Sequence, residues 1–216
     1  MKHILTDQER IHLDQRITEV EKGTGTQIVL AVIERSDVFA ELPWKAFALG
    51  AAVSGLAAVL FSLLRPGWQS NFTVLFAVVT TLAISAACSL LCVVYPKFAR
   101  LLLDAHRAEV EARQYAESLF LSRELFATRG RAGVLLLVSM FEQQVVLLPD
   151  TGLRKRLGRE AQQAIVDTMT AFLATGTVSG ALEKGLRELE QRLAATATGA
   201  SLESELPNTI IEEKGA

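Results

Sequence analysis

The chain has 216 residues, of which 50% are hydrophobic and 21% are charged, and its formal net charge at pH 7 is −2. This composition excludes a disordered chain, and it provides no positive field that would attract nucleic acid, so we expect no nucleic-acid partner. The charges are unevenly spread, because only Lys45 and Arg65 are charged between Trp44 and Pro96. The charge-poor stretch excludes a uniformly soluble protein, and the polar remainder excludes a transporter with many membrane spans.

The N-terminal part predicts one helix followed by one strand. Thr6 and Glu9 have the spacing of a capping box, which predicts a helix over Asp7–Lys22. The continuous apolar run Gln27–Ile33 is typical of a strand that is buried on both faces. Because residues 1–7 become polar at once, we expect no cleaved secretion signal.

Two apolar runs predict a transmembrane helical hairpin. Trp44–Leu64 has 21 residues and Phe72–Tyr95 has 24, and each exceeds the roughly 20 residues that a helix needs to cross a bilayer. The intervening Pro66-Gly67 pair is a strong turn signal. The alternative is a pair of buried helices in a soluble core. Small residues at four-residue spacing predict where the two helices touch: Gly50, Ser54 and Ala58 on the first, and Ser85 and Ser89 on the second.

The basic residues around the hairpin predict its orientation. Arg65 is alone in the connection, whereas five cations flank the hairpin: Arg35, Lys45, Lys97, Arg100 and Arg107. Loops rich in Lys and Arg stay in the cytoplasm. We therefore expect a multi-pass protein of the cytoplasmic membrane with its polar domain on the cytoplasmic side.

The chain after the hairpin predicts further helices and two strands. A long, Ala-rich helix is expected over Phe98–Phe126, strands over Val134–Met140 and Gln144–Leu148, and a basic helix starting at Leu153–Leu157. Two more helices are expected, and the acidic C-terminal tail is expected to be either an extended edge piece or disordered. The two helices are expected over Gln162–Thr175 and Val178–Ala194, and the tail comprises residues 196–216.

These elements predict an α/β layered sandwich with a small central sheet flanked by helices. Strands this apolar need helices on both faces. The first strand precedes the hairpin and its sheet partners follow it, so the hairpin is expected to be an insertion within one domain. The expected boundaries are 1–43 and 96–195 for the two parts of that domain, 44–95 for the hairpin and 196–216 for the tail.

Three stretches in this order resemble the TPM domain family. They are Thr6–Leu30 with its Thr-Gly-Thr-Gln-Ile-Val segment, Phe120–Val138 with Thr-Arg-Gly-Arg-Ala-Gly-Val-Leu, and Val145–Leu153 with Pro-Asp-Thr-Gly-Leu. The segment Glu205–Asn208 is similar to the ending of the subgroup that carries a membrane hairpin. The resemblance implies an α/β domain of a bacterial membrane protein. Some relatives are described as acid phosphatases, and others as metal-binding or accessory domains of membrane complexes.

Two groups of polar residues are candidate sites. Asp150 follows a strand and, with Glu142 or Glu34, would offer Ca²⁺ or Mg²⁺ the oxygen ligands that these ions prefer. The alternative for Asp150 is a simple β-turn. A phosphate group would be bound by Thr128, Arg129 and Arg131. The alternative for these residues is a solvated loop with a capping threonine.

No residue is assigned a catalytic role, and two functions remain open. The first is a membrane-anchored accessory or interaction module for a membrane or envelope complex, with a protein partner in the membrane and a bound divalent cation as an option. The second is a weak metal-dependent acid phosphatase, which would need a metal cluster or an activated nucleophile.

Overall fold

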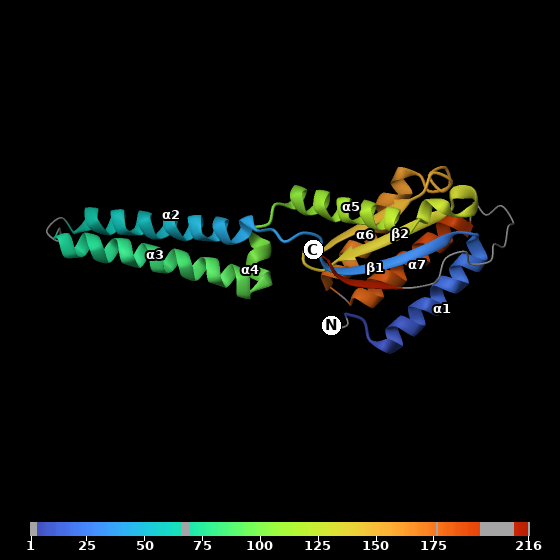
Figure 1. The fold of residues 1–216 in the computed structure, drawn as a ribbon, viewed down its shortest axis with the longest axis horizontal. Coiled ribbons are helices and arrows are strands. Elements are labelled where there is room, and N and C mark those ends of the chain that lie inside the picture. The colour runs from blue at the N-terminus through green and yellow to red at the C-terminus, as the bar shows by residue number, and fades with distance from the viewer. Residues whose placement is uncertain (1–3, 66–69, 176, 195–209, 216) are drawn as a thin grey trace. The chain divides into compact units, whose positions relative to one another are not determined.

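The computed structural model describes residues 4–65, 70–175, 177–194 and 210–215. It divides the chain into two compact units (Figure 1). The first, here called the α/β unit, comprises Met1–Asp37 and His106–Ala216. The second, here called the hairpin unit, comprises Val38–Ala105. The α/β unit is therefore built from two segments that are far apart in the sequence.

The α/β unit contains a mixed four-stranded sheet in the order β3-β2-β1-β4. β1 runs parallel to both of its neighbours, β2 and β4, whereas β2 and β3 form an antiparallel hairpin. Every residue of β1 from Gln27 to Ile33 is buried, as its continuous apolar sequence predicts. The strands are β1 (Gln27–Arg35), β2 (Gly133–Ser139), β3 (Gln144–Pro149) and β4 (Ile211–Gly215).

Helices cover both faces of this sheet, which confirms the predicted layered α/β class. α1 (Asp7–Thr24), α6 (Arg159–Thr175) and α7 (Val178–Ala194) pack on the face that carries Leu30 and Leu136. α5 (Ala105–Ser122) packs on the other face, and Figure 1 shows α5 and α1 on opposite sides of the sheet. Small side chains, among them Ala116, let α5 lie close to the strands.

The first helix begins at Asp7, as its sequence predicts, and ends at Thr24, two residues later than predicted. Thr6 accepts a hydrogen bond from the Glu9 backbone, and the Glu9 carboxylate accepts one from the Thr6 backbone, so the capping box is formed. Gly25 ends the helix with φ +65°, a conformation that glycine adopts without strain.

The hairpin unit consists of α2 (Glu41–Leu64), α3 (Asn71–Val94) and the short α4 (Pro96–Leu101). α2 and α3 pack along each other, and α4 contacts both of them (Figure 1). α2 and α3 are long and apolar enough to cross a membrane, and only 6% and 11% of their most apolar windows are buried. The expected helix over 44–64 begins three residues earlier than predicted, and the expected helix over 72–95 agrees to within one residue.

Two predicted helices are wrong in extent. The expected single helix Phe98–Phe126 is interrupted after Leu101, and α5 begins at Ala105. Asp104 precedes α5, and aspartate favours the position before a helix over its interior. The segment Leu153–Leu157 forms consecutive turns, and α6 begins only after Gly158, because Leu153 and Leu157 are both buried in a tight loop.

β4 is a polar edge strand that charged contacts fix on both faces. Glu212 pairs with Arg10 of α1 at 2.8 Å and accepts the Ile4 backbone N–H at 3.2 Å. Glu213 accepts the Tyr115 hydroxyl at 2.7 Å. Of the two alternatives for the tail, residues 211–215 adopt the extended edge piece, while 195–209 and 216 lie outside the described residues.

The attachment of β4 is predicted to depend on pH through Glu212. Burial alone would raise the pKa of Glu212, but the hydrogen bonds from Arg10 and the Ile4 backbone lower it below the ordinary value of 4.5. The ionised carboxylate therefore stabilises β4 above about pH 4.5, and this contribution is lost as the pH falls through the lower folded pKa. Glu212→Gln should weaken β4 by about 1 kcal/mol and speed amide exchange of residues 211–214 about fivefold at pH 7.

The matched control is Glu109→Gln, which removes an exposed carboxylate on α5 and should leave exchange in β4 unchanged. Hydrogen exchange is measured on the full chain and corrected for the intrinsic rate. Equal protection of β4 in the wild type and in Glu212→Gln would contradict this account.

Candidate functional site

Asp150 lies at the end of β3, where β3 meets the beginning of β2. Its backbone N–H donates to the Gly133 carbonyl at 2.8 Å, and its Oδ1 accepts the Thr151 N–H at 2.6 Å. The residue is 6% exposed. Its Oδ2 is buried, accepts no hydrogen bond from the described residues, and lies 3.8 Å from Nη1 of Arg131. The carboxylate therefore orders the turn and faces a cation of the same protein.

The residues predicted to bind phosphate lie in the loop that precedes β2, next to the turn that contains Asp150. The Thr128 hydroxyl donates to the Leu125 carbonyl at 3.3 Å, and Arg131 Nη1 donates to the Phe126 carbonyl at 3.1 Å. Both groups thus hold the chain that enters β2. Arg129 begins the 3₁₀ turn η2 (Arg129–Arg131), and its side chain lies outside the described part. Binding of phosphate by these three residues stays a prediction.

A close backbone crossing joins this turn to the one that contains Asp150. The Gly152 N–H donates to the Arg131 carbonyl at 3.1 Å. A Cβ at Gly152 would lie 2.6 Å from the Arg131 carbonyl oxygen and closer still to that of Gly130. Only glycine fits here, so the Pro-Asp-Thr-Gly turn has a packing reason for its last residue.

Glu142 lies at the opposite end of β3, in the turn between β2 and β3. Its Oε1 accepts both the backbone N–H and the hydroxyl of Ser36 at 2.8 Å, and its Oε2 accepts the Ser139 hydroxyl. The exit of β1 is thereby tied to this turn. Glu34 is nearby, because its carbonyl accepts the Phe141 N–H at 2.8 Å, but its side chain is exposed.

The three carboxylates proposed as metal ligands are therefore not brought together. The six residues of β3 separate Asp150 from Glu142, a distance of about 20 Å for an extended strand. One ion cannot contact both residues. Within the described ranges, no group of three or more His, Cys, Asp or Glu side chains is arranged to hold a metal ion. A Ca²⁺ or Mg²⁺ ion at Asp150 alone stays a prediction.

A cleft that no sequence pattern indicates lies between α5 and β4. It has a volume of about 360 Å³. Burial and the hydrogen bond to Glu213 raise the pKa of Tyr115 to about 12, so its hydroxyl remains a donor at neutral pH. This cleft exists because the C-terminal strand docks on β1, which no local pattern predicts. Its lining residues are Tyr115, Ser118, Leu119, Ser122, Arg123 and Glu213.

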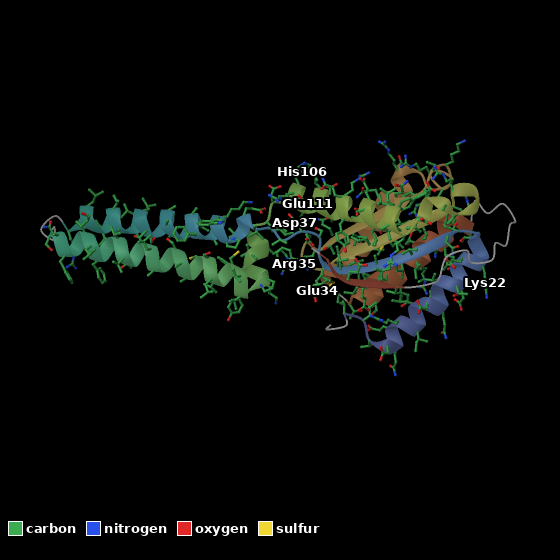
Figure 2. All side chains as sticks on the ribbon, in the orientation of Figure 1. Lys22, Glu34, Arg35, Asp37, His106 and Glu111 are labelled. Carbon is green, nitrogen blue, oxygen red and sulfur yellow. The ribbon has the colours of Figure 1, made fainter. Side chains whose placement is uncertain are left out.

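The two segments that flank the hairpin unit in sequence are tied within the α/β unit. Asp37 is its last residue before the hairpin unit, and it pairs at 3.4 Å with Arg107, its second residue afterwards. Arg35 lies over the Phe141 ring at 5.4 Å. Figure 2 shows Glu34, Arg35, Asp37 and His106 at one end of the sheet and Lys22 at the other. The chain leaves and re-enters the α/β unit at the same end.

Small residues form the contact between α2 and α3. A Cβ on Gly50 would lie 2.9 Å from the Ser85 Cα and 3.2 Å from the Cys88 Sγ, so the two backbones approach closely there. The Ser54 and Ser85 hydroxyls donate to the carbonyls of Gly50 and Thr81, at 2.5 and 2.7 Å, within their own helices. The other predicted packing residues, Ala58 and Ser89, are partly buried.

Comparison with known proteins finds a partial match to a protein family and a solved structure of similar fold. Residues 100–192 match the TPM domain family, and this range contains two of the three stretches that carried the resemblance. The NMR structure of the BA42 protein from the psychrophilic bacterium Bizionia argentinensis is similar, with a TM-score of 0.58 and 14% identity over 98% of this chain and 97% of that one. At this identity the likeness shows the fold alone. The chain matches no curated protein sequence.

The crossing at Gly152 gives a stability prediction. Gly152→Ala should lower the free energy of unfolding of the α/β unit by about 2 kcal/mol, because a Cβ there forces two carbonyls apart. The matched control is Gly158→Ala, where a Cβ meets no atom within 4 Å and the change should stay within about 1 kcal/mol. Pulse proteolysis of the full chain in urea measures both variants. Equal loss of stability in the two variants would show that the crossing is not tight.

Proposed function

We propose that α2 and α3 cross the cytoplasmic membrane as a helical hairpin and anchor the α/β unit to it. The observation that carries this proposal is the distribution of side chains in the hairpin unit. Gly50 and Ser85 are buried, and Ser54, Ala58 and Ser89 are partly buried, whereas most Leu, Val and Phe side chains of the two helices are exposed. Val53 and Leu82, near the middle of the two helices, are 62% and 55% exposed.

This distribution is the reverse of a soluble core. A water-soluble helix pair buries its Leu, Val and Phe side chains and exposes its small polar ones. In lipid there is no hydrophobic gain from pairing two helices, so close packing of small residues holds them together. An outward surface of Leu, Val and Phe along two helices of 24 residues each fits hydrocarbon and not water.

The charge distribution supports a cytoplasmic location for the α/β unit. Lys45 is one turn into α2, and Lys97 and Arg100 are in α4, which lies at the same end of the two helices (Figure 1). Arg65 alone follows α2 at the other end. By the positive-inside rule, the flanks stay in the cytoplasm and the connection between α2 and α3 is outside.

For the α/β unit we propose an accessory or interaction role in a membrane complex. The similarity of residues 100–192 to the TPM domain supports it. Three of the six candidate polar side chains have structural partners: Glu142 accepts hydrogen bonds from Ser36 and Ser139, and Thr128 and Arg131 hold the entry to β2. A protein partner in the same membrane would complete the complex, and crosslinking in native membranes would identify it.

Alkaline carbonate extraction of cell membranes tests the anchor. The full chain should stay in the membrane pellet, and Val53→Arg combined with Leu82→Arg should release most of it, because each arginine costs about 2.5–3.5 kcal/mol near the bilayer centre. The matched control places arginines at exposed positions of α5 and α6, Glu117→Arg and Gln163→Arg, and should stay in the pellet.

Full release of the wild-type chain by carbonate would contradict the membrane anchor. A different result would contradict the accessory role. Turnover of a simple phosphate ester by the full chain with Mg²⁺ or Ca²⁺, abolished in Asp150→Asn, would instead favour the metal-dependent phosphatase.

A further inference from the structure

One end of the hairpin unit carries a group of cations, here called the basic collar: Lys45, Lys97 and Arg100. Lys45 is one turn into α2, and the other two lie in α4. α4 contacts both long helices, so the three residues gather at one end of the hairpin. Lys45 and Lys97 are exposed.

Exposed aromatic and apolar side chains accompany these cations. Trp44 and Tyr95, next to the collar in sequence, are 73% and 59% exposed, and Leu101 of α4 is 81% exposed. Amphipathic aromatic rings beside lysines are typical of the level where hydrocarbon meets headgroups. From Trp44 to Leu64, α2 rises about 30 Å, the thickness of the hydrocarbon core.

The two ends of the hairpin differ in charge. The collar end has three cations against two carboxylates, Glu41 and Asp104, and the two lysines lie on its exposed surface. At the other end Arg65 is the only charged residue from Leu64 to Asn71. An excess of exposed ammonium groups at headgroup depth complements negatively charged lipid phosphates.

We propose that the basic collar selects anionic phospholipids, with Lys45 and Lys97 contacting their phosphate groups. The inference rests on the proposed membrane anchor and adds to it a lipid class at one end of the hairpin. The lysine stems lie along the apolar surface, and their ammonium groups reach the phosphates. Zwitterionic lipids offer the same phosphate beside a compensating cation, so they compete poorly. The contact should weaken at high salt, because it is electrostatic.

The two tryptophans of the chain provide a reporter at each end. Trp68→Phe leaves Trp44 beside the collar, and Trp44→Phe leaves Trp68 in the connection between α2 and α3. Each single-tryptophan full chain is reconstituted in phosphatidylcholine vesicles that contain a fixed fraction of phosphatidylglycerol. Acyl-chain bromine is placed on one lipid or the other, and quenching of tryptophan fluorescence reports which lipid is in contact.

Brominated phosphatidylglycerol should be enriched about fivefold around Trp44, the effect expected of one engaged cation, and should show no enrichment around Trp68. The double variant Lys45→Gln/Lys97→Gln should abolish this enrichment, to a ratio of about 1. The addition of 0.5 M salt to the wild-type collar should have the same effect. The matched control Arg65→Gln should leave it at about fivefold.

Two outcomes would overturn the inference, and they are distinguishable. If both brominated lipids quench Trp44 equally in the wild-type collar, the hairpin is inserted but the collar is not selective. If neither brominated lipid quenches Trp44, the hairpin is not in the bilayer, and the anchor and the collar fail together.

Discussion

The fold depends on the position of β1 in the sheet. β1 is hydrogen-bonded on both sides by strands that follow the hairpin unit in the chain, β2 and β4. The chain must therefore leave the α/β unit after β1 and return to it before the sheet is complete. The Asp37–Arg107 pair and the Glu142 hydrogen bonds to Ser36 hold the exit and the return at one end of the sheet. The hairpin is thus an insertion in one domain, and folding of that domain requires both of its segments.

The same insertion gives the molecule its two contrasting surfaces. In the α/β unit, the apolar strands are covered by helices on both faces, and charged side chains lie outside. In the hairpin unit, Gly50 and Ser85 lie at the contact between the helices, and most of the large apolar side chains are exposed. These are the two solutions expected for water and for hydrocarbon as solvents. In the proposed function, the hairpin would keep the α/β unit close to the bilayer, where an integral membrane partner would be met.

Sequence patterns predict most of this fold, because β1, β2 and the hairpin helices are long, apolar and bounded by turn residues. Sequence patterns do not predict the conformation of segments that is set by contacts with residues far away in the chain. Leu153–Leu157 has a helix-like composition, but its two leucines are drawn into the core and the segment is a series of turns. β4 ends in Glu213, Lys214 and Gly215, and its docking depends on distant residues, among them Arg10 and Tyr115, about 100 to 200 positions away. The separation of Asp150 from Glu142 follows from the sequence, since residues that flank one strand lie at its opposite ends.

Spin-label accessibility in lipid vesicles tests the outward apolar surface most directly. A nitroxide at position 53 or 82 of the full chain, with Cys88 and Cys92 replaced by alanine, is compared for collision with oxygen and with a water-soluble nickel complex. The account predicts high oxygen and low nickel accessibility at both positions, because both lie near the bilayer centre. High nickel accessibility, or low accessibility to both reagents as in a soluble core, would contradict the membrane hairpin.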